Sequence, residues 1–186
     1  MQAVLVPRLS FSEVIETRLV EREIHADVND QVLAVDVDDR WAAVFRFSLG
    51  SDGEYSTEIE LAQLAGPAKW EWLSSGGLRG IGWYGLPWES PPERWDGAHL
   101  LSFGASGRDV ELDDGSDRRM VAVCGFASDT TEMVRVVSSG RERWIKPSPT
   151  GAFVAVAVGQ GTEFLEVAPW GGGAELSPAF SYPDEW

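Results

Sequence analysis

Cysteine and histidine are scarce in this sequence, whose 186 residues include one Cys and two His. The single thiol, Cys124, excludes an intrachain disulfide, and its apolar neighbours in MVAVCGF predict an inert side chain in a buried strand. Zinc sites are built mainly from clustered Cys and His. Three such residues, spread widely along the chain, predict that the protein holds no zinc and uses no cofactor.

Positive charge is also scarce, because 15 Lys and Arg stand against 30 Asp and Glu, giving a net charge of −15. Affinity for nucleic acid comes largely from Lys and Arg that neutralise phosphates. We therefore expect no nucleic-acid partner. An acidic protein that imitates nucleic acid is an alternative. It would need carboxylates ranked along one face, whereas these are scattered over turns and strand edges.

Long apolar runs are missing. The longest covers residues 152–158, far short of the roughly 20 residues that a membrane-spanning helix needs. The first residues, MQAVLVPRLSFSE, lack the basic start and the long apolar core of a secretory signal. The expectation is a bacterial protein in the cytoplasm with no membrane contact.

What the sequence does contain, from residue 99 onward, is a regular succession of strand and turn signals. Seven strands are expected at residues 99–103, 108–112, 118–126, 131–137, 141–145, 152–159 and 163–170. Turn signals every 8–12 residues are typical of an antiparallel β-sandwich. Residues 104–107 read as a turn, and Asp114-Gly115 as a type I′ hairpin. Alternation along the strands predicts a buried core of Val121, Val123, Val134, Val136, Phe153, Val154, Val156 and Leu165.

Residues 1–98 also read as mainly β, with strands in QVLAVDVD, RWAAVFRFSL, EYSTEIELAQL and KWEWLSS and hairpins at Asp38-Asp39 and residues 50–53. Ser10 followed by Glu13 is a capping-box pattern, which favours a short helix near residues 10–24, although a strand fits nearly as well. The expected fold class is all-β. It comprises an N-terminal β-rich unit over 1–98, with a Trp/Gly/Pro-rich segment at 74–98, a sandwich over 99–170 and a flexible acidic-aromatic tail over 171–186.

One stretch resembles a known group of proteins. Between residues 122 and 170 the chain has a Gly-Phe pair after a strand, a Val-Arg-Val run, a Gly-Arg turn and the sequence SPTGAFVAV. This stretch resembles the small immunoglobulin-like β-sandwich modules of uncharacterised actinobacterial proteins. The resemblance implies a fold and assigns no site residue.

No catalytic signature is visible. His25 and His99 are the only histidines that could activate a serine, and no G-x-S-x-G elbow accompanies them. A structural role is expected for both, and no catalytic residue is assigned.

Two other kinds of site depend on carboxylates. A glycosidase needs two acids beside aromatic rings, and a calcium site needs several oxygens in a compact loop. The candidate acids of a glycosidase site are Glu71, Glu89, Glu93 and Asp96, and the candidate calcium ligands are Asp113, Asp114 and Asp117. The calcium candidates lack the spacing of a calcium loop, so no metal is expected.

Tryptophan is abundant, with nine residues, five of them between residues 70 and 95. The candidate aromatic patch consists of Trp70, Trp72, Trp83, Tyr84, Trp88 and Trp95. These rings either fill a core or interdomain seam, or form a contact surface, because Trp and Tyr concentrate binding energy at interfaces. A contact surface would make the protein a non-catalytic module for protein recognition or self-association. A carbohydrate-binding module and a small glycoside-active enzyme are the alternatives.

The last residues offer a second candidate. Three glycines precede a stretch that carries Phe180, Tyr182 and Trp186. The three aromatic side chains would be anchors if this stretch is a flexible arm bearing a recognition motif. The same stretch could instead fold back and complete a sheet edge, and the sequence does not choose between the two.

Overall fold

In the computed structural model the described part of the chain is almost entirely β, as the sequence predicts. It comprises residues 9–18, 20–21, 30–49, 55–67, 69–79, 99–159 and 165–182. The elements are α1 (Phe11–Thr17), β1 (Asp30–Asp38), β2 (Trp41–Leu49), β3 (Tyr55–Leu64), β4 (Trp70–Arg79), β5 (Leu100–Glu111), β6 (Asp117–Ala127), β7 (Met133–Ser138), β8 (Arg141–Ile145), β9 (Ala152–Gly159), β10 (Leu165–Gly171), β11 (Ala174–Glu175) and β12 (Phe180–Tyr182).

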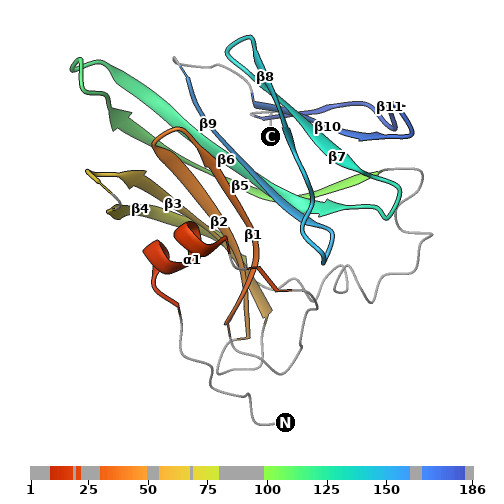
Figure 1. Ribbon diagram of the computed structural model, residues 1–186, viewed down its shortest axis with the longest axis horizontal. Helices are drawn as coiled ribbons and strands as arrows, with labels where there is room; N and C mark the ends of the chain where they lie inside the picture. Colours follow the sequence, from red (N-terminus) through yellow and green to blue (C-terminus); the bar gives the residue numbers. More distant parts are fainter. Residues whose placement is uncertain are drawn as a thin grey trace.

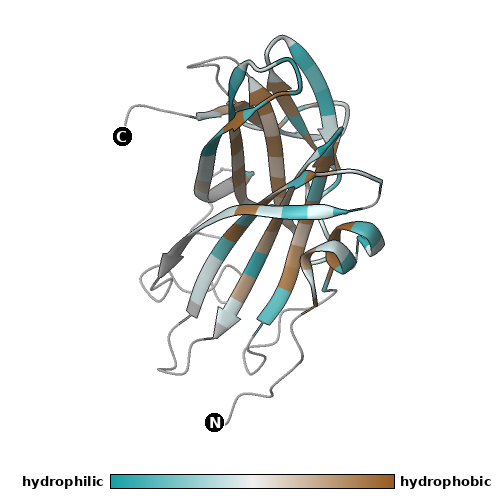
Figure 2. Cartoon of the chain, turned by 90° about the vertical axis from the view of Figure 1, so that its left-hand side faces the viewer, coloured by the Kyte–Doolittle hydropathy of each residue, from teal (hydrophilic) through white to brown (hydrophobic). Residues whose placement is uncertain are grey.

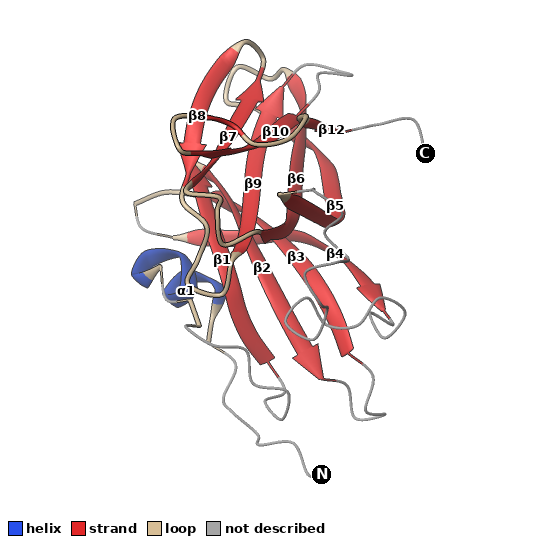
Figure 3. Cartoon of the chain, turned by 90° about the vertical axis from the view of Figure 1, so that its right-hand side faces the viewer, coloured by secondary structure: helices blue, strands red, loops and turns tan. Residues whose placement is uncertain are grey.

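The strands form three antiparallel sheets (Figure 1). The first sheet has the order β1-β2-β3-β4, and the middle sheet has the order β5-β6-β9. The outer sheet has the order β11-β10-β7-β8, and β12 also pairs with β10. Helix α1 lies against the first sheet on the side away from the other two, beside β1 (Figure 3). The layers are therefore helix, first sheet, middle sheet and outer sheet.

Helix α1 confirms the predicted capping box. The backbone N–H of Glu13 donates to the hydroxyl of Ser10, and the N–H of Ser10 donates to the carboxylate of Glu13 at 2.9 Å. Such reciprocal bonds satisfy donors that a helix start would otherwise leave without partners. Val14 and Ile15 are buried against the first sheet. A strand, the other interpretation of this segment, does not form here.

Two hydrophobic cores meet at the middle sheet. One lies between the first and middle sheets and contains Phe45, Leu61 and Val154, and the other lies between the middle and outer sheets around Phe153 and Val134. Alternate residues of β9 therefore point into opposite cores, as its sequence predicts. All eight residues of the predicted core are buried. Figure 2 shows hydrophobic residues running along these strands and hydrophilic ones toward the turns.

The count of seven strands between residues 99 and 170 is wrong, because β5 is one long strand where two were expected. Residues 104–107, interpreted as a turn, continue the strand and pair with β6 throughout. The chain is only offset by a bulge between Ser102 and Gly104. Pairing with the equally long β6 supplies ladder bonds over the whole length. This tertiary context overrides the local turn preference of Gly and Ser.

The hairpin from β5 to β6 is confirmed, but its turn is not type I′. Gly115 has a φ of 75°, while Asp114 has no positive φ, as a type I′ turn would require. The N–H of Gly115 donates to the carbonyl of Leu112, whose own N–H donates to Ser116. This is a loop closed by a left-handed glycine. The β1–β2 hairpin also forms, but its turn is Asp39-Arg40, one residue later than predicted, because Asp38 still pairs with Trp41. Residues 50–53 lie outside the described residues.

An ion pair covers the exposed edge of β9. Among the described strands β9 is the last of the middle sheet, so the outward N–H and C=O of Val156 face none of these strands as a ladder partner. Asp36 of β1 accepts from the N–H of Val156 at 2.8 Å, and Arg143 of β8 donates to its carbonyl. Arg143 also binds Asp36 through two guanidinium nitrogens, at 2.8 and 2.5 Å. One side chain from each neighbouring sheet thus closes the edge of the middle sheet.

A second buried ion pair lies beneath α1. Arg46 of β2 is almost fully buried and donates to Glu60 of β3 and, at 3.1 Å, to Asp30 of β1. Buried charges need such partners, because desolvation otherwise makes them very costly. The two partners explain how a strand of the first sheet tolerates an arginine on its helix-facing side.

The end of the chain folds back onto the outer sheet. Strand β12 pairs with β10, and Phe180 and Tyr182 pack against the core between the middle and outer sheets. Residues 174–182 therefore follow the second of the two alternatives open for this stretch, completion of a sheet edge. Trp186 lies outside the described residues.

Candidate functional site

Two residues of the predicted aromatic patch are described, and they have different environments. Trp70 and Trp72 share one face of β4, as their spacing predicts, because they pair with Leu64 and Ala62 of β3. Trp70 packs beside the small core under α1, whereas 57% of Trp72 is exposed. The remaining members, Trp83, Tyr84, Trp88 and Trp95, lie outside the described residues. The patch as a whole thus stays a prediction.

The candidate carboxylates beside the tryptophans are only partly placed. Glu71 is exposed and accepts from Lys69 at 2.9 Å, on the opposite face of the strand from Trp70 and Trp72. Glu89, Glu93 and Asp96 lie outside the described residues. A pair of acids beside the tryptophans therefore stays a prediction.

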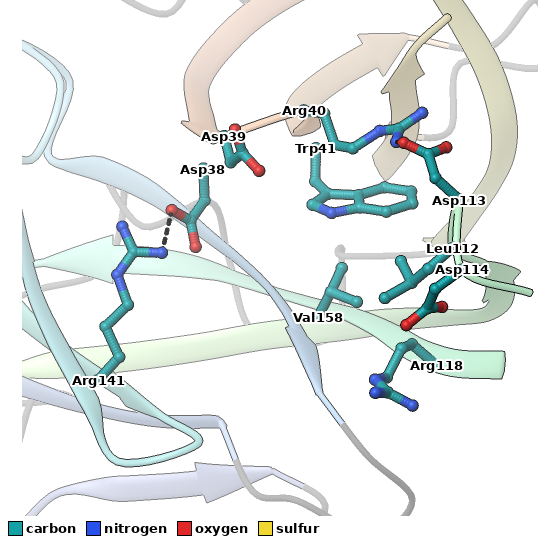
Figure 4. Close-up of a pocket in the computed structure, with 10 residues that line it drawn as sticks. All are labelled: Asp38, Asp39, Arg40, Trp41, Leu112, Asp113, Asp114, Arg118, Arg141 and Val158. Atoms are coloured by element: carbon teal, nitrogen blue, oxygen red, sulfur yellow. Dashed lines mark hydrogen bonds and ion pairs between the residues drawn. The ribbon is translucent and has the colours of Figure 1, made fainter. Parts of the chain in front are cut away.

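A pocket of about 440 Å³ opens between two hairpins, β1–β2 and β5–β6 (Figure 4). Its apolar residues are Trp41, Leu112 and Val158. Charged side chains surround them, namely Asp38, Asp39, Arg40, Asp113, Asp114, Arg118 and Arg141. The volume lies within the usual range of ligand sites. Whether the pocket could bind a ligand therefore depends on how its charges are paired and on how accessible its apolar residues are.

The charges of this pocket largely satisfy one another. Arg40 donates to Asp113 at 2.5 Å, and Arg141 donates to Asp38 at 3.0 Å. The guanidinium of Arg40 also lies 5.7 Å from the centre of the Trp41 ring, which is only 6% exposed. A buried ring offers little surface on which a ligand could stack. The pocket is therefore best described as a cleft between two hairpins that the Arg40–Asp113 ion pair links, and not as a ligand site.

Two of the three calcium candidates, Asp113 and Asp114, line this pocket, whereas Asp117 begins β6 and is not among the lining residues. The hydrogen bond from Arg40 lowers the pKa of Asp113, and the hydroxyl of Ser116 lowers the pKa of Asp114. Both carboxylates therefore already have protein donors. Within the described ranges, no group of three or more His, Cys, Asp or Glu side chains is placed to hold a metal ion.

The outer face of the outer sheet presents a different surface. The strand register places three rows of side chains across it, and these rows define what we name the tryptophan face. The rows are Glu142–Val137–Glu166, Trp144–Arg135–Ala168 and Met133–Trp170–Glu175. Opposite this face, Val134 and Val136 point into the core. Of the elements that the structure describes, none is packed over the tryptophan face.

Two indole rings meet on this face. Trp144 of β8 and Trp170 of β10 lie edge to face, with ring centroids 5.2 Å apart and planes at 78°. They reach each other across β7, which separates their strands. Trp144 is 41% exposed, whereas Ala168 beside it is fully buried. The larger side chains thus close over the small one and leave an indole at the surface.

One arginine holds three carboxylates together beside the rings. Arg135 donates to Glu166 at 3.0 Å, and to Glu142 and Glu175 at 3.3 Å each. Its Nε is buried without a hydrogen-bond partner. The carboxylates remain 36–48% exposed. They therefore keep acceptor capacity toward solvent or toward a partner.

Sequence reasoning missed this face, although part of its signal was present. Alternation along β7 already placed Met133 and Arg135 on one side and the core valines on the other. The same period in residues 141–145 and 163–170 would put Trp144 and Trp170 on outward positions. The cross-strand register that makes them neighbours is not readable from either segment alone.

His99 and Cys124, which carry a basic and a nucleophilic side chain respectively, both have structural roles. The Nδ1 of His99 lies 3.0 Å from the hydroxyls of Ser128 and Thr130, and its carbonyl accepts from the N–H of Ser128. These bonds tie the residue before β5 to the turn after β6. Cys124 is buried, and burial raises the pKa of its thiol above the ordinary value. His25 lies outside the described residues.

In comparison with known proteins, the chain matches no family model, no curated protein and no solved structure. None of the described helices has the length and apolarity to cross a membrane. The class defined by the fold is an all-β protein of three stacked antiparallel sheets.

Proposed function

We propose that this chain is a non-catalytic recognition module that binds a protein partner through the tryptophan face. The observation that carries the proposal is the exposed Trp144, held in contact with Trp170 on a sheet face over which no described element packs. Trp and Arg are the residues in which interface binding energy concentrates. Here Trp144 and Arg135 lie directly opposite each other on one face of the sheet.

The cores give this surface a rigid support. Val134 and Val136 of β7 are fully buried directly beneath Met133 and Arg135. A binding surface on a well-packed sheet loses little conformational entropy when a partner docks, which favours affinity.

The resemblance to immunoglobulin-like modules is part of the same proposal. Counting from β5, the first, second and fifth strands form the middle sheet, and the third, sixth and seventh belong to the outer sheet. The fourth strand pairs with the third. Variable-type immunoglobulin domains extend the corresponding sheet in this way. The strand order supports the resemblance and adds no ligand.

The test is differential capture from a lysate of the source organism with wild type, Trp144→Ala and Trp72→Ala. Trp72 is the comparison, because it is an exposed tryptophan on another sheet and a member of the predicted aromatic patch, so loss of capture by W72A alone would favour that patch instead. We expect a protein that wild type and W72A retain and that W144A loses. Sedimentation of the three proteins shows whether that partner is a second copy of the chain. Identical capture by W144A and wild type, at equal thermal stability, would refute the proposal.

A further inference from the structure

We infer that the tryptophan face recognises a basic, arginine-rich segment of its protein partner. The inference rests on the proposed function and adds the chemistry of the partner. It follows from three features of the face: its charge, the exposed indole beside that charge, and the geometry of the carboxylates.

The face carries an excess of negative charge. Three carboxylates against one guanidinium leave a net charge of −2 across the three rows, within a chain of −15. Interfaces match positive patches to negative ones, and like charges brought together are strongly unfavourable. An acidic partner is therefore disfavoured. A second copy of this face is disfavoured for the same reason.

The exposed indole suits the same kind of partner. Guanidinium and ammonium groups are attracted to the faces of aromatic rings, most strongly to Trp. Trp144 lies directly opposite Arg135 in the strand register, and Arg135 holds Glu142 and Glu166. A cation resting on the indole would therefore have carboxylates close by. Planar guanidinium groups pair with carboxylates in a bidentate manner and stack on rings, which favours arginine over lysine.

The arrangement also explains why Arg135 does not neutralise the site. A single guanidinium is shared among three carboxylates, two of them at 3.3 Å, and each carboxylate keeps more than a third of its surface exposed. Its own Nε has no acceptor. Arg135 therefore fixes the positions of the three carboxylates around its guanidinium while leaving acceptor oxygens for an incoming guanidinium.

The test uses the full chain and a twelve-residue peptide that alternates arginine and serine, titrated calorimetrically in 150 mM salt. The comparison peptide carries citrulline, the neutral isostere of arginine, at every arginine position. We expect the arginine peptide to bind at least about tenfold more tightly than the citrulline peptide, because both the cation–π contact and the ion pairs need the charge. The affinity should fall as salt is raised.

Three variants separate this face from the general charge of the chain. Trp144→Ala should weaken the arginine peptide by about tenfold, and Glu166→Gln by about threefold to tenfold. The matched control is Glu111→Gln, an exposed glutamate on the middle sheet. It should stay within about twofold of wild type, since it lies outside the proposed contact.

The outcomes also separate this inference from the proposed function. If E111Q weakens binding as much as E166Q, or if the citrulline peptide binds equally well, the basic-segment inference fails. The recognition proposal still stands in that case, provided lysate capture depends on Trp144. If capture does not depend on Trp144, the recognition proposal fails even where the peptide binds. A neutral xylo-oligosaccharide that perturbs Trp144, with the arginine peptide inert, would overturn both.

Discussion

At the scale of single residues, the stability of this protein depends on a few buried charges that bridge its layers. Asp36 and Arg143 come from different sheets and are 107 positions apart in the chain, yet both bind the backbone of Val156. A carboxylate in such a place has no water to replace a lost partner. The bonds that it makes must all come from protein.

Replacing Asp36 by Ala should therefore destabilise the protein by about 3 kcal/mol or more. The change removes both short bonds to the Arg143 guanidinium and leaves this buried cation with only the contact of its Nε to Asp38, at 3.8 Å. Asp109→Ala is the control, because it removes the same charge from an ion pair that lies open to solvent. The Asp109 side chain, which binds Arg119, is 76% exposed. Its loss should cost less than about 1 kcal/mol. Urea unfolding of both variants measures the difference, and equal losses would contradict the role given to the buried pair.

At the scale of elements, the hairpins show where local sequence decides the backbone. The turn between β7 and β8 has Ser139 and Gly140 at φ values of 52° and 72°, as a type I′ hairpin requires. The β5–β6 turn instead places only Gly115 in the left-handed region. Both turns are read from local residue types, and both join strands that are paired from end to end.

Replacing Gly115 by Ala should cost about 1–2 kcal/mol, because a side chain in the left-handed region meets its own backbone. A Cβ at this position would have no other neighbour within 4 Å, so crowding adds nothing. Gly115→Asn separates the two effects, since Asn tolerates this conformation much better. Thermal unfolding should rank wild type above Asn and Asn above Ala. An Asn variant as unstable as the Ala variant would show that the cost does not arise from φ.

At the scale of the whole molecule, the middle sheet belongs to two cores at once. Met120 and Cys124 of β6 face the first sheet, while Val121 and Val123 of the same strand face the outer sheet. Along the chain, the predicted domain boundary near residue 98 separates the strands of the first sheet from those of the middle sheet. The core between these two sheets therefore contains residues from both sides of the boundary.

We expect the described layers to unfold in one cooperative transition, because neither outer layer can leave without exposing a face of the middle sheet. Phe45→Ala and Phe153→Ala should each lower the free energy of unfolding by about 3–5 kcal/mol. They lie in different cores but should shift the same transition, seen alike by tryptophan fluorescence and far-UV circular dichroism. Two transitions, with F45A moving only one, would instead support independent units on either side of residue 98.

The sequence by itself determined the features that depend on neighbouring residues. Alternation placed Phe153 opposite Val154, the Ser10 and Glu13 pair predicted the capped helix, and turn residues located the β5–β6 hairpin. These are short-range properties, because side-chain direction repeats every two residues in a strand and caps act within one helical turn. They were sufficient for the fold class and for the buried core of the later strands.

Tertiary structure decided what depends on pairing between distant segments. Residues 104–107 carry turn signals but extend β5, since β6 offers ladder partners along their whole length. The covering of the β9 edge requires Asp36 of the first sheet and Arg143 of the outer sheet to meet at the edge of the middle sheet. The tryptophan face likewise exists only because the register of β7 with β8 and β10 brings Trp144 to Trp170. Register is set by packing against the rest of the molecule, which no local stretch of sequence contains.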